Sequence, residues 1–212
     1  MGSYGLIFGP SKSGKTILGE NLALSFAAGL PECLGLPIGT PPQKVLFISL
    51  EEFWQYRTER NKRQIEFIRG TGKEGFENNY LVVTENFPRH VHDNKGWEIL
   101  RKTILESESK IIIVDSLTRL NAGQIEDSSV SEAMSLKLRG LSSTLGTTMV
   151  VIHHSRKQYG EAITIDTLAG SRVLSQEADF LIGINKVAKG IRYYKEVAFR
   201  YKQENDESVI PF

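Results

Sequence analysis

Short apolar runs alternate with segments of helical spacing over the first 154 residues of the chain. Such runs are typical of buried strands, and the longer segments between them predict helices. The run KIIIVDS at 110–116 is apolar without alternation, which is typical of a parallel strand covered on both faces. The other expected strands are 4–8, 44–50, 80–85 and 147–154, and the expected helices are 15–29, 53–70, 94–107 and 128–145. This order predicts an α/β fold with a mostly parallel central sheet and helices on both faces.

The pattern changes after residue 154. Residues 155–170 are polar and contain two glycines, so we expect a mobile loop there, followed by a short helix over 171–178. Three apolar runs then predict strands joined by tight turns, an antiparallel β meander at one edge of the sheet. These runs are 179–186, 193–202 and 207–212. A further loop, rich in Pro and Gly, is expected at 34–43, and we find no repeat or boundary that would divide residues 1–212 into more than one domain.

Composition narrows the class of protein. A chain of 212 residues with 40% hydrophobic content suits one α/β domain with a full core. With a net charge of +1, the chain lacks the overall excess of basic residues that is typical of a dedicated nucleic-acid binder, although local basic patches stay possible. The single cysteine, Cys33, excludes an internal disulfide and is expected to be a packed, reduced residue. The sequence contains neither a signal-peptide pattern nor an apolar run of transmembrane length, so we expect a soluble cytoplasmic protein.

The segment FGPSKSGKT at 8–16 carries the clearest chemical signal. It matches the pattern G-x-x-x-x-G-K-[ST] between an expected strand and an expected helix, which is the context of a phosphate-binding P-loop. The glycines let backbone N–H groups point at phosphate oxygens, and Lys15 is expected to reach the β and γ phosphates. A glycine-rich turn without a ligand is the alternative, and the flanking elements count against it. The predicted nucleotide-binding residues are Gly9, Pro10, Ser11, Lys12, Ser13, Gly14, Lys15 and Thr16, with Lys12 either a phosphate contact or a solvent-facing side chain.

Asp115 ends the most apolar strand. Ligands of open α/β sheets bind at the carboxyl ends of the strands, so this carboxylate is placed to help hold Mg²⁺ together with the Thr16 hydroxyl. The alternative is an aspartate that caps the following turn. Ser116 is a further candidate for positioning the metal's surroundings.

Glu51 and Glu52 follow the strand at 44–50. Hydrolysis of a bound nucleotide needs a group that orients water opposite the leaving phosphate, and a carboxylate at the tip of the neighbouring strand can supply it. We favour Glu51 as the catalytic base because it comes first beyond the apolar run. The alternative is an acidic pair that is stabilised by the N-terminus of the next helix.

His153 and His154 end the strand at 147–154 and precede the polar loop. Adjacent residues on a strand point to opposite faces, so only one of the two can face the nucleotide. A lone histidine is usually structural, but a pair at this place suggests that one of them senses the γ-phosphate and signals to the loop. The sequence does not decide which one.

Basic residues gather near the C-terminus. Six cations between Lys186 and Lys202 stand against one acid, Glu196. The cations are Lys186, Lys189, Arg192, Lys195, Arg200 and Lys202. This edge is either a solvated hairpin or a surface offered to a phosphate, on a neighbouring subunit or on DNA.

The order of the motifs resembles that of the RecA-like ATPases, and most closely that of the RepA-type hexameric replicative helicase group. These motifs are the P-loop, VLFISLEE, IIIVDSLTRL, MVVIHHSRK and LAGSRVLSQEADFLIGI. The resemblance covers nearly the whole chain. It implies a RecA core, ATP and Mg²⁺ as cofactors, and hydrolysis at interfaces within a homo-oligomeric ring or filament. It also implies that Glu51 is the base, that the histidine pair is a γ-phosphate switch and that Arg60 stacks on adenine.

The same resemblance implies that segments 118–130 and 155–170 are the loops that touch single-stranded DNA, with Arg156 and Lys157 as contacts to backbone phosphates. Arg200 and Lys202 become the candidates for a finger that reaches into a neighbouring site. Two departures stand out: Glu204 lies where related motors often have an arginine, and the chain begins at its first strand, without the preceding element that related helicases often use to assemble. An isolated core, a fragment and a stand-alone ATPase therefore stay open.

Three functions fit these observations. The first is a DNA-dependent helicase or helicase-like motor. The second is a recombinase-like or regulatory ATPase that binds DNA or protein without unwinding. The third is an interaction module gated by nucleotide binding. A kinase fits less well because the sequence has no recognisable lid or acceptor motif.

Overall fold

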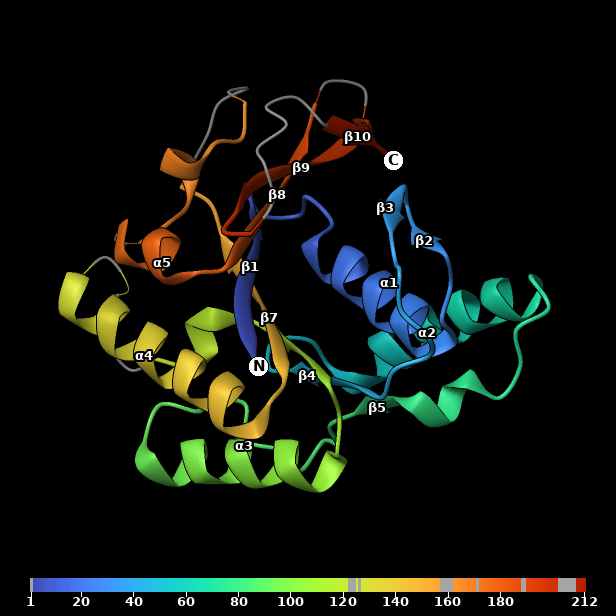
Figure 1. Cartoon of the computed structure of the whole chain (residues 1–212), viewed down its shortest axis with the longest axis horizontal. Coiled ribbons are helices and arrows are strands. Elements are labelled where there is room, and N and C mark those ends of the chain that lie inside the picture. Colours follow the sequence, from blue (N-terminus) through green and yellow to red (C-terminus); the bar gives the residue numbers. More distant parts are fainter. Residues whose placement is uncertain are drawn as a thin grey trace.

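One mostly parallel sheet organises the chain (Figure 1). The computed structural model describes residues 2–121, 125, 127–156, 162–170, 172–187, 190–201 and 209–212. The strand order is β10-β9-β8-β1-β7-β6-β4-β5. The strands are β1 (Ser3–Gly9), β4 (Val45–Ser49), β5 (Tyr80–Val82), β6 (Ile111–Asp115), β7 (Thr148–His154), β8 (Phe180–Lys186), β9 (Arg192–Phe199) and β10 (Val209–Pro211). Strands β1 and β4 to β8 pair in parallel, whereas β9 and β10 continue the sheet as antiparallel strands, so the predicted α/β core and antiparallel edge are confirmed.

Helices cover both faces of the sheet (Figure 1). The α-helices are α1 (Lys15–Ala28), α2 (Trp54–Arg69), α3 (Asn94–Ser107), α4 (Ser128–Leu145) and α5 (Arg172–Glu177). Short 3₁₀ helices are η1 (Phe76–Asn79), η2 (Leu117–Arg119) and η3 (Ile165–Thr167). Side chains of α3, α4 and α5 share one apolar core with Leu6 and Phe8 of β1, while those of α1 and α2 share a second core with Ile7. Successive β1 residues thus enter opposite cores, which explains why the central strands are apolar without alternation.

Local signals in the sequence set the ends of the helices. The carboxylate of Asp93 accepts a hydrogen bond from Gly96 N at 2.7 Å, and the carboxylate of Asp127 accepts one from Ser129 N at 2.8 Å, so α3 and α4 each begin at an aspartate cap. The helix α1 ends at Gly29, whose φ of 59° lies in the left-handed region that glycine adopts without strain.

The prediction of a loop over residues 34–43 is partly wrong. Glu32–Cys33 (β2) pairs with Leu36–Pro37 (β3) as a small antiparallel ribbon. The Tyr194 hydroxyl donates to Leu34 O at 2.9 Å and ties this ribbon to β9. Cys33 is buried and its thiol is free, as expected. Strand β5 is also shorter than predicted and ends at Val82.

Among the described residues, no helix is both long enough and apolar enough to cross a membrane.

The register of the sheet brings the motif residues to one edge. Gly9 of β1 lies opposite His154 of β7, and Ser49 of β4 lies opposite Asp115 of β6. These strands are parallel, so the P-loop, the residues after β4 and the end of β6 all lie at the carboxyl edge, where open α/β sheets bind ligands.

Candidate active site

The loop between β1 and α1 has the backbone geometry of a phosphate cradle. Gly14 caps α1 with a φ of 103°, a conformation that residues with a side chain rarely adopt. At Gly9, a Cβ atom would lie only 2.0 Å from the carbonyl oxygen of Ile184, so β8 leaves room for glycine alone. The two glycines of the motif are therefore required by geometry, and the helix directs the positive end of its dipole into the loop.

Lys15 is held inside this loop. Its Nζ donates to Gly9 O at 3.0 Å and to Pro10 O at 2.7 Å, and the residue is buried. Burial lowers the pKa of Lys15, while the carboxylates of Asp115 and Glu51 act in the opposite direction. A buried cation at a helix N-terminus is suited to bind a polyphosphate.

Thr16 and Asp115 meet directly. Thr16 Oγ1 donates to Asp115 Oδ2 at 2.6 Å, and Asp115 is buried. Burial raises the pKa of Asp115 to about 6, against the opposing effect of the Thr16 hydrogen bond. Hydroxyl and carboxylate oxygens are hard ligands of the kind that Mg²⁺ prefers, so this pair fits that ion. Within the described ranges no group of three or more His, Cys, Asp or Glu side chains could hold a metal.

Glu51 follows β4 and points toward the residues after β6. Its Oε1 accepts a hydrogen bond from Thr118 Oγ1 at 2.9 Å and a very short one from Ser116 Oγ. Burial acts to raise the pKa of Glu51. The hydrogen bonds from the Ser116 and Thr118 hydroxyls and the charges of His154 and Arg119 together outweigh burial, so the pKa of Glu51 lies below its usual value. The carboxylate is therefore ionised at neutral pH and fixed in orientation.

The two histidines separate onto opposite faces. His153 is buried, and its Nε2 donates to Ala169 O at 3.1 Å; burial lowers its pKa to about 4. Since Ile152 belongs to the core on the α1 side, His154, two residues later, points to the same side as the P-loop. Burial and the charge of Lys15 lower the pKa of His154, with Glu51 opposing them. Of the pair, His154 is thus the one placed toward the predicted phosphate site.

Arg60 joins two helices by ion pairs. Its Nε donates to Glu20 Oε2 at 2.5 Å and its Nη1 donates to Glu52 Oε1 at 2.9 Å, and Glu20 is fully buried on α1. These ion pairs hold the guanidinium between Glu20 of α1 and the residue that follows Glu51. Glu52 therefore supports Arg60 instead of joining Glu51.

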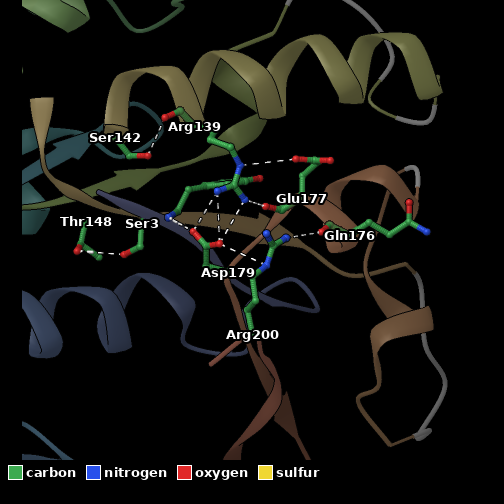
Figure 2. Close-up of polar contacts among 9 residues, drawn as sticks. Ser3, Arg139, Ser142, Thr148, Gln176, Glu177, Asp179 and Arg200 are labelled. Carbon is green, nitrogen blue, oxygen red and sulfur yellow. Dashed lines mark hydrogen bonds and ion pairs between the residues drawn. The ribbon is translucent and has the colours of Figure 1, made fainter. Parts of the chain in front are cut away.

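Arg200 belongs to a network around Asp179 (Figure 2). Arg200 Nε lies 3.5 Å from Asp179 Oδ1, and its Nη2 donates to Gln176 O at 2.9 Å. Asp179 also pairs with Arg139 of α4 and accepts from Tyr4 N at 3.0 Å. This network connects the end of β9 to α4 and β1. Lys202, the second finger candidate, lies outside the described residues.

The predicted DNA loops are only partly described. Arg156 Nη2 donates to Gly170 O at 3.4 Å, and Arg156 N donates to Thr167 O at 2.8 Å. Lys157 and parts of both loops lie outside the described residues. Thr118, the first residue of the predicted loop 118–130, was not predicted to contact Glu51. A hydroxyl residue two positions after Ser116, close to the end of a buried strand, is nevertheless a readable signal for such a partner of a carboxylate.

Comparison with known proteins supplies the family. A model of the family described as AAA domain matches residues 1–160, a span that contains the P-loop, Glu51, Asp115 and both histidines. A comparison with curated proteins finds no match. The match covers more than half of the chain, and the chain therefore belongs to the AAA domain family of P-loop ATPases.

Proposed function

We propose that the chain hydrolyses ATP as the motor core of a helicase of the RepA-type hexameric group, working as a homo-oligomer on single-stranded DNA. The observation that carries this proposal is the meeting of Lys15, Thr16, Asp115 and Glu51 at one sheet edge. A P-loop alone binds phosphate, whereas this set adds a fixed, ionised carboxylate, Glu51, from the end of β4. In the sheet β4 lies next to β6, the strand that carries Asp115, and not next to the P-loop strand β1.

In this mechanism Lys15 and the N–H groups of the loop bind the β and γ phosphates. Thr16 and Asp115 would hold Mg²⁺, which neutralises charge on the phosphates when it is bound. Glu51 orients the attacking water and accepts its proton, since its low pKa keeps it ionised. The hydroxyls of Ser116 and Thr118 hold the carboxylate in position.

His154 is the proposed sensor of the γ-phosphate. Its backbone connects the P-loop with the segment that carries Arg156: Ser155 N donates to Gly9 O at 2.9 Å, and Ala169 N donates to His154 O at 3.1 Å. Ser155 also forms a β-bridge with Leu168. A shift of His154 toward bound phosphate would therefore move both ends of the polar loop.

The DNA role rests on the resemblance and on this loop. Arg156 and Lys157 are the proposed contacts to backbone phosphates, and segment 118–130 is the second proposed contact. Arg60 is the proposed adenine platform, since a planar guanidinium can stack on an aromatic ring. Arg200 and Lys202 stay the proposed fingers toward a neighbouring subunit.

ATPase rate with and without single-stranded DNA, measured alongside mass by light scattering, tests the proposal. We expect an oligomer whose ATPase rate rises on DNA. A stable oligomer that binds and hydrolyses ATP but ignores DNA favours a regulatory ATPase. A monomer that binds ATP without significant turnover favours the nucleotide-gated interaction module.

A further inference from the structure

The antiparallel edge of the sheet brings one more cation to the P-loop. Strand β9 runs antiparallel to β8, with Arg192 opposite Lys186 and Tyr194 opposite Ile184. The first residue of β9 therefore lies at the carboxyl end of β8. Since β8 is parallel to β1, this is the sheet edge that carries the phosphate cradle.

Strand periodicity sets the direction of the Arg192 side chain. Tyr194 is fully buried in the core on the α1 side, together with Ile184. Residues two apart on a strand point to the same face. Arg192 thus points to the α1 face, toward the helix N-terminus that begins at Lys15.

Contacts at Gly14 confirm this direction. A Cβ atom at Gly14 would lie 3.3 Å from Arg192 Cδ and 3.5 Å from Arg192 Nε. The arginine side chain therefore lies against the glycine that immediately precedes Lys15, within its own subunit.

The Nε group of Arg192 is buried and has no hydrogen-bond partner among the described residues. The ion pairs found in the described part of the chain likewise leave Arg192 out, whereas Arg60, Arg139 and Arg200 are each held by carboxylates. Buried N–H donors are nearly always paired, so an unpaired one beside a phosphate loop indicates an acceptor that belongs there.

We infer that Arg192 is a nucleotide-binding residue that donates to phosphate oxygens of the ATP held by its own P-loop. The inference rests on the proposed function, because it assumes that a nucleoside polyphosphate occupies the loop. It assigns to the basic C-terminal edge a role within one subunit, in addition to any role toward a neighbour. A planar guanidinium with several donors suits this task better than an ammonium group.

Titrations of the fluorescent probe mant-ADP, with unlabelled ADP and ATPγS as competitors, test the inference. Arg192→Ala and Arg192→Gln should each weaken binding of ADP and ATPγS by about tenfold or more, the usual effect of losing a charge-assisted hydrogen bond. Arg192→Lys should recover part of the loss. Lys195→Ala, on the same strand, is the matched control for charge and should bind within about twofold of the wild type. Circular dichroism and thermal unfolding establish that each variant is folded.

Lys15→Ala separates this inference from the proposed function. If Lys15→Ala loses binding while both Arg192 variants keep the wild-type affinity, the loop binds nucleotide and the role of Arg192 is wrong. If Lys15→Ala also keeps the wild-type affinity, the proposed function fails.

Mixing two impaired variants, at an ATP concentration too low to fill the Arg192→Ala sites, tests the assignment to a single subunit. When Lys15→Ala chains are mixed with Arg192→Ala chains, a residue acting within its own subunit leaves every site incomplete, so ATPase activity stays low. Recovery of activity on mixing would show that Arg192 acts across an interface and would overturn the inference.

Discussion

Thr16 Oγ1 donates to Asp115 Oδ2 at 2.6 Å, a contact between residues that stand 99 positions apart in the sequence. It joins the first residues of α1 to the end of β6, and thereby joins the phosphate cradle to the carboxylate expected to hold Mg²⁺. Asp115→Asn keeps an oxygen for the Thr16 hydroxyl but removes the charge. We expect Mg²⁺-dependent ATPase activity to fall by about a hundredfold.

A Mg²⁺ titration of the ATPase rate checks this prediction. The control is Asp93→Asn, which changes an aspartate that caps α3. An equal loss of activity in both variants, or none in Asp115→Asn, would contradict the assignment of Asp115.

His153 should make stability depend on pH. Its pKa is about 4 in the folded chain, against an ordinary value near 6.5, because burial disfavours the imidazolium. Between these values the unfolded chain binds more protons than the folded one, so stability is lost as pH falls from about 6.5 to about 4. In that window the wild type should lose about 1 kcal/mol more per pH unit than His153→Gln, whose amide can still donate to Ala169 O.

Urea unfolding between pH 7 and pH 4.5 measures this difference. His92→Gln, at an exposed site, is the control and should follow the wild type. Parallel curves for the wild type and His153→Gln would show that His153 is not kept neutral by burial.

Asp179→Ala should destabilise the fold. The change removes the acceptor of Tyr4 N and the shared partner of Arg139 and Arg200 (Figure 2). Both arginines are partly exposed and can return to water, so we expect a loss of about 1–3 kcal/mol in the free energy of unfolding. Asp166→Ala, which removes an exposed carboxylate 4.0 Å from Arg172, should cost far less in the same urea experiment. Equal costs would argue against the network.

Arg156→Ala should weaken binding to single-stranded DNA. The loss of one phosphate contact lowers the slope of log affinity against log salt by about one. Fluorescence anisotropy of a labelled oligonucleotide at several salt concentrations provides the slope. Arg101→Ala, an exposed cation on α3, is the control. If the slope is the same in Arg156→Ala as in the wild type, Arg156 does not contact the DNA phosphates.

Much of the fold could be predicted because the signals are local. The buried strand KIIIVDS, the P-loop between a strand and a helix, and the aspartates and glycines at helix ends each act within a few residues. The β2–β3 ribbon was missed because its two short strands are stabilised by a distant contact, from Tyr194 to Leu34. A Pro- and Gly-rich segment gives no sign of such a partner.

In the candidate active site, too, the residues with local sequence patterns could be predicted, whereas those that depend on the three-dimensional arrangement could not. Lys15, Thr16 and Asp115 carry recognisable patterns, and their proximity follows from the parallel order of the strands. The choice between His153 and His154 depends on which face of β7 each side chain points to, and the sequence does not determine this. The approach of Arg192 to Gly14 needed the register of β8 and β9, so within the sequence Arg192 is indistinguishable from the other basic residues of that edge.

The comparison of Glu51→Gln with the wild type tests the proposed hydrolysis most directly. Single-turnover ATPase rates and mant-ATP binding should be measured together, with Glu52→Gln as the neighbouring control. We predict that Glu51→Gln binds nucleotide as the wild type does and hydrolyses it about a hundred- to ten-thousandfold more slowly, as expected when a general base is removed. Hydrolysis by Glu51→Gln at the wild-type rate would contradict the assignment of Glu51 as the catalytic base.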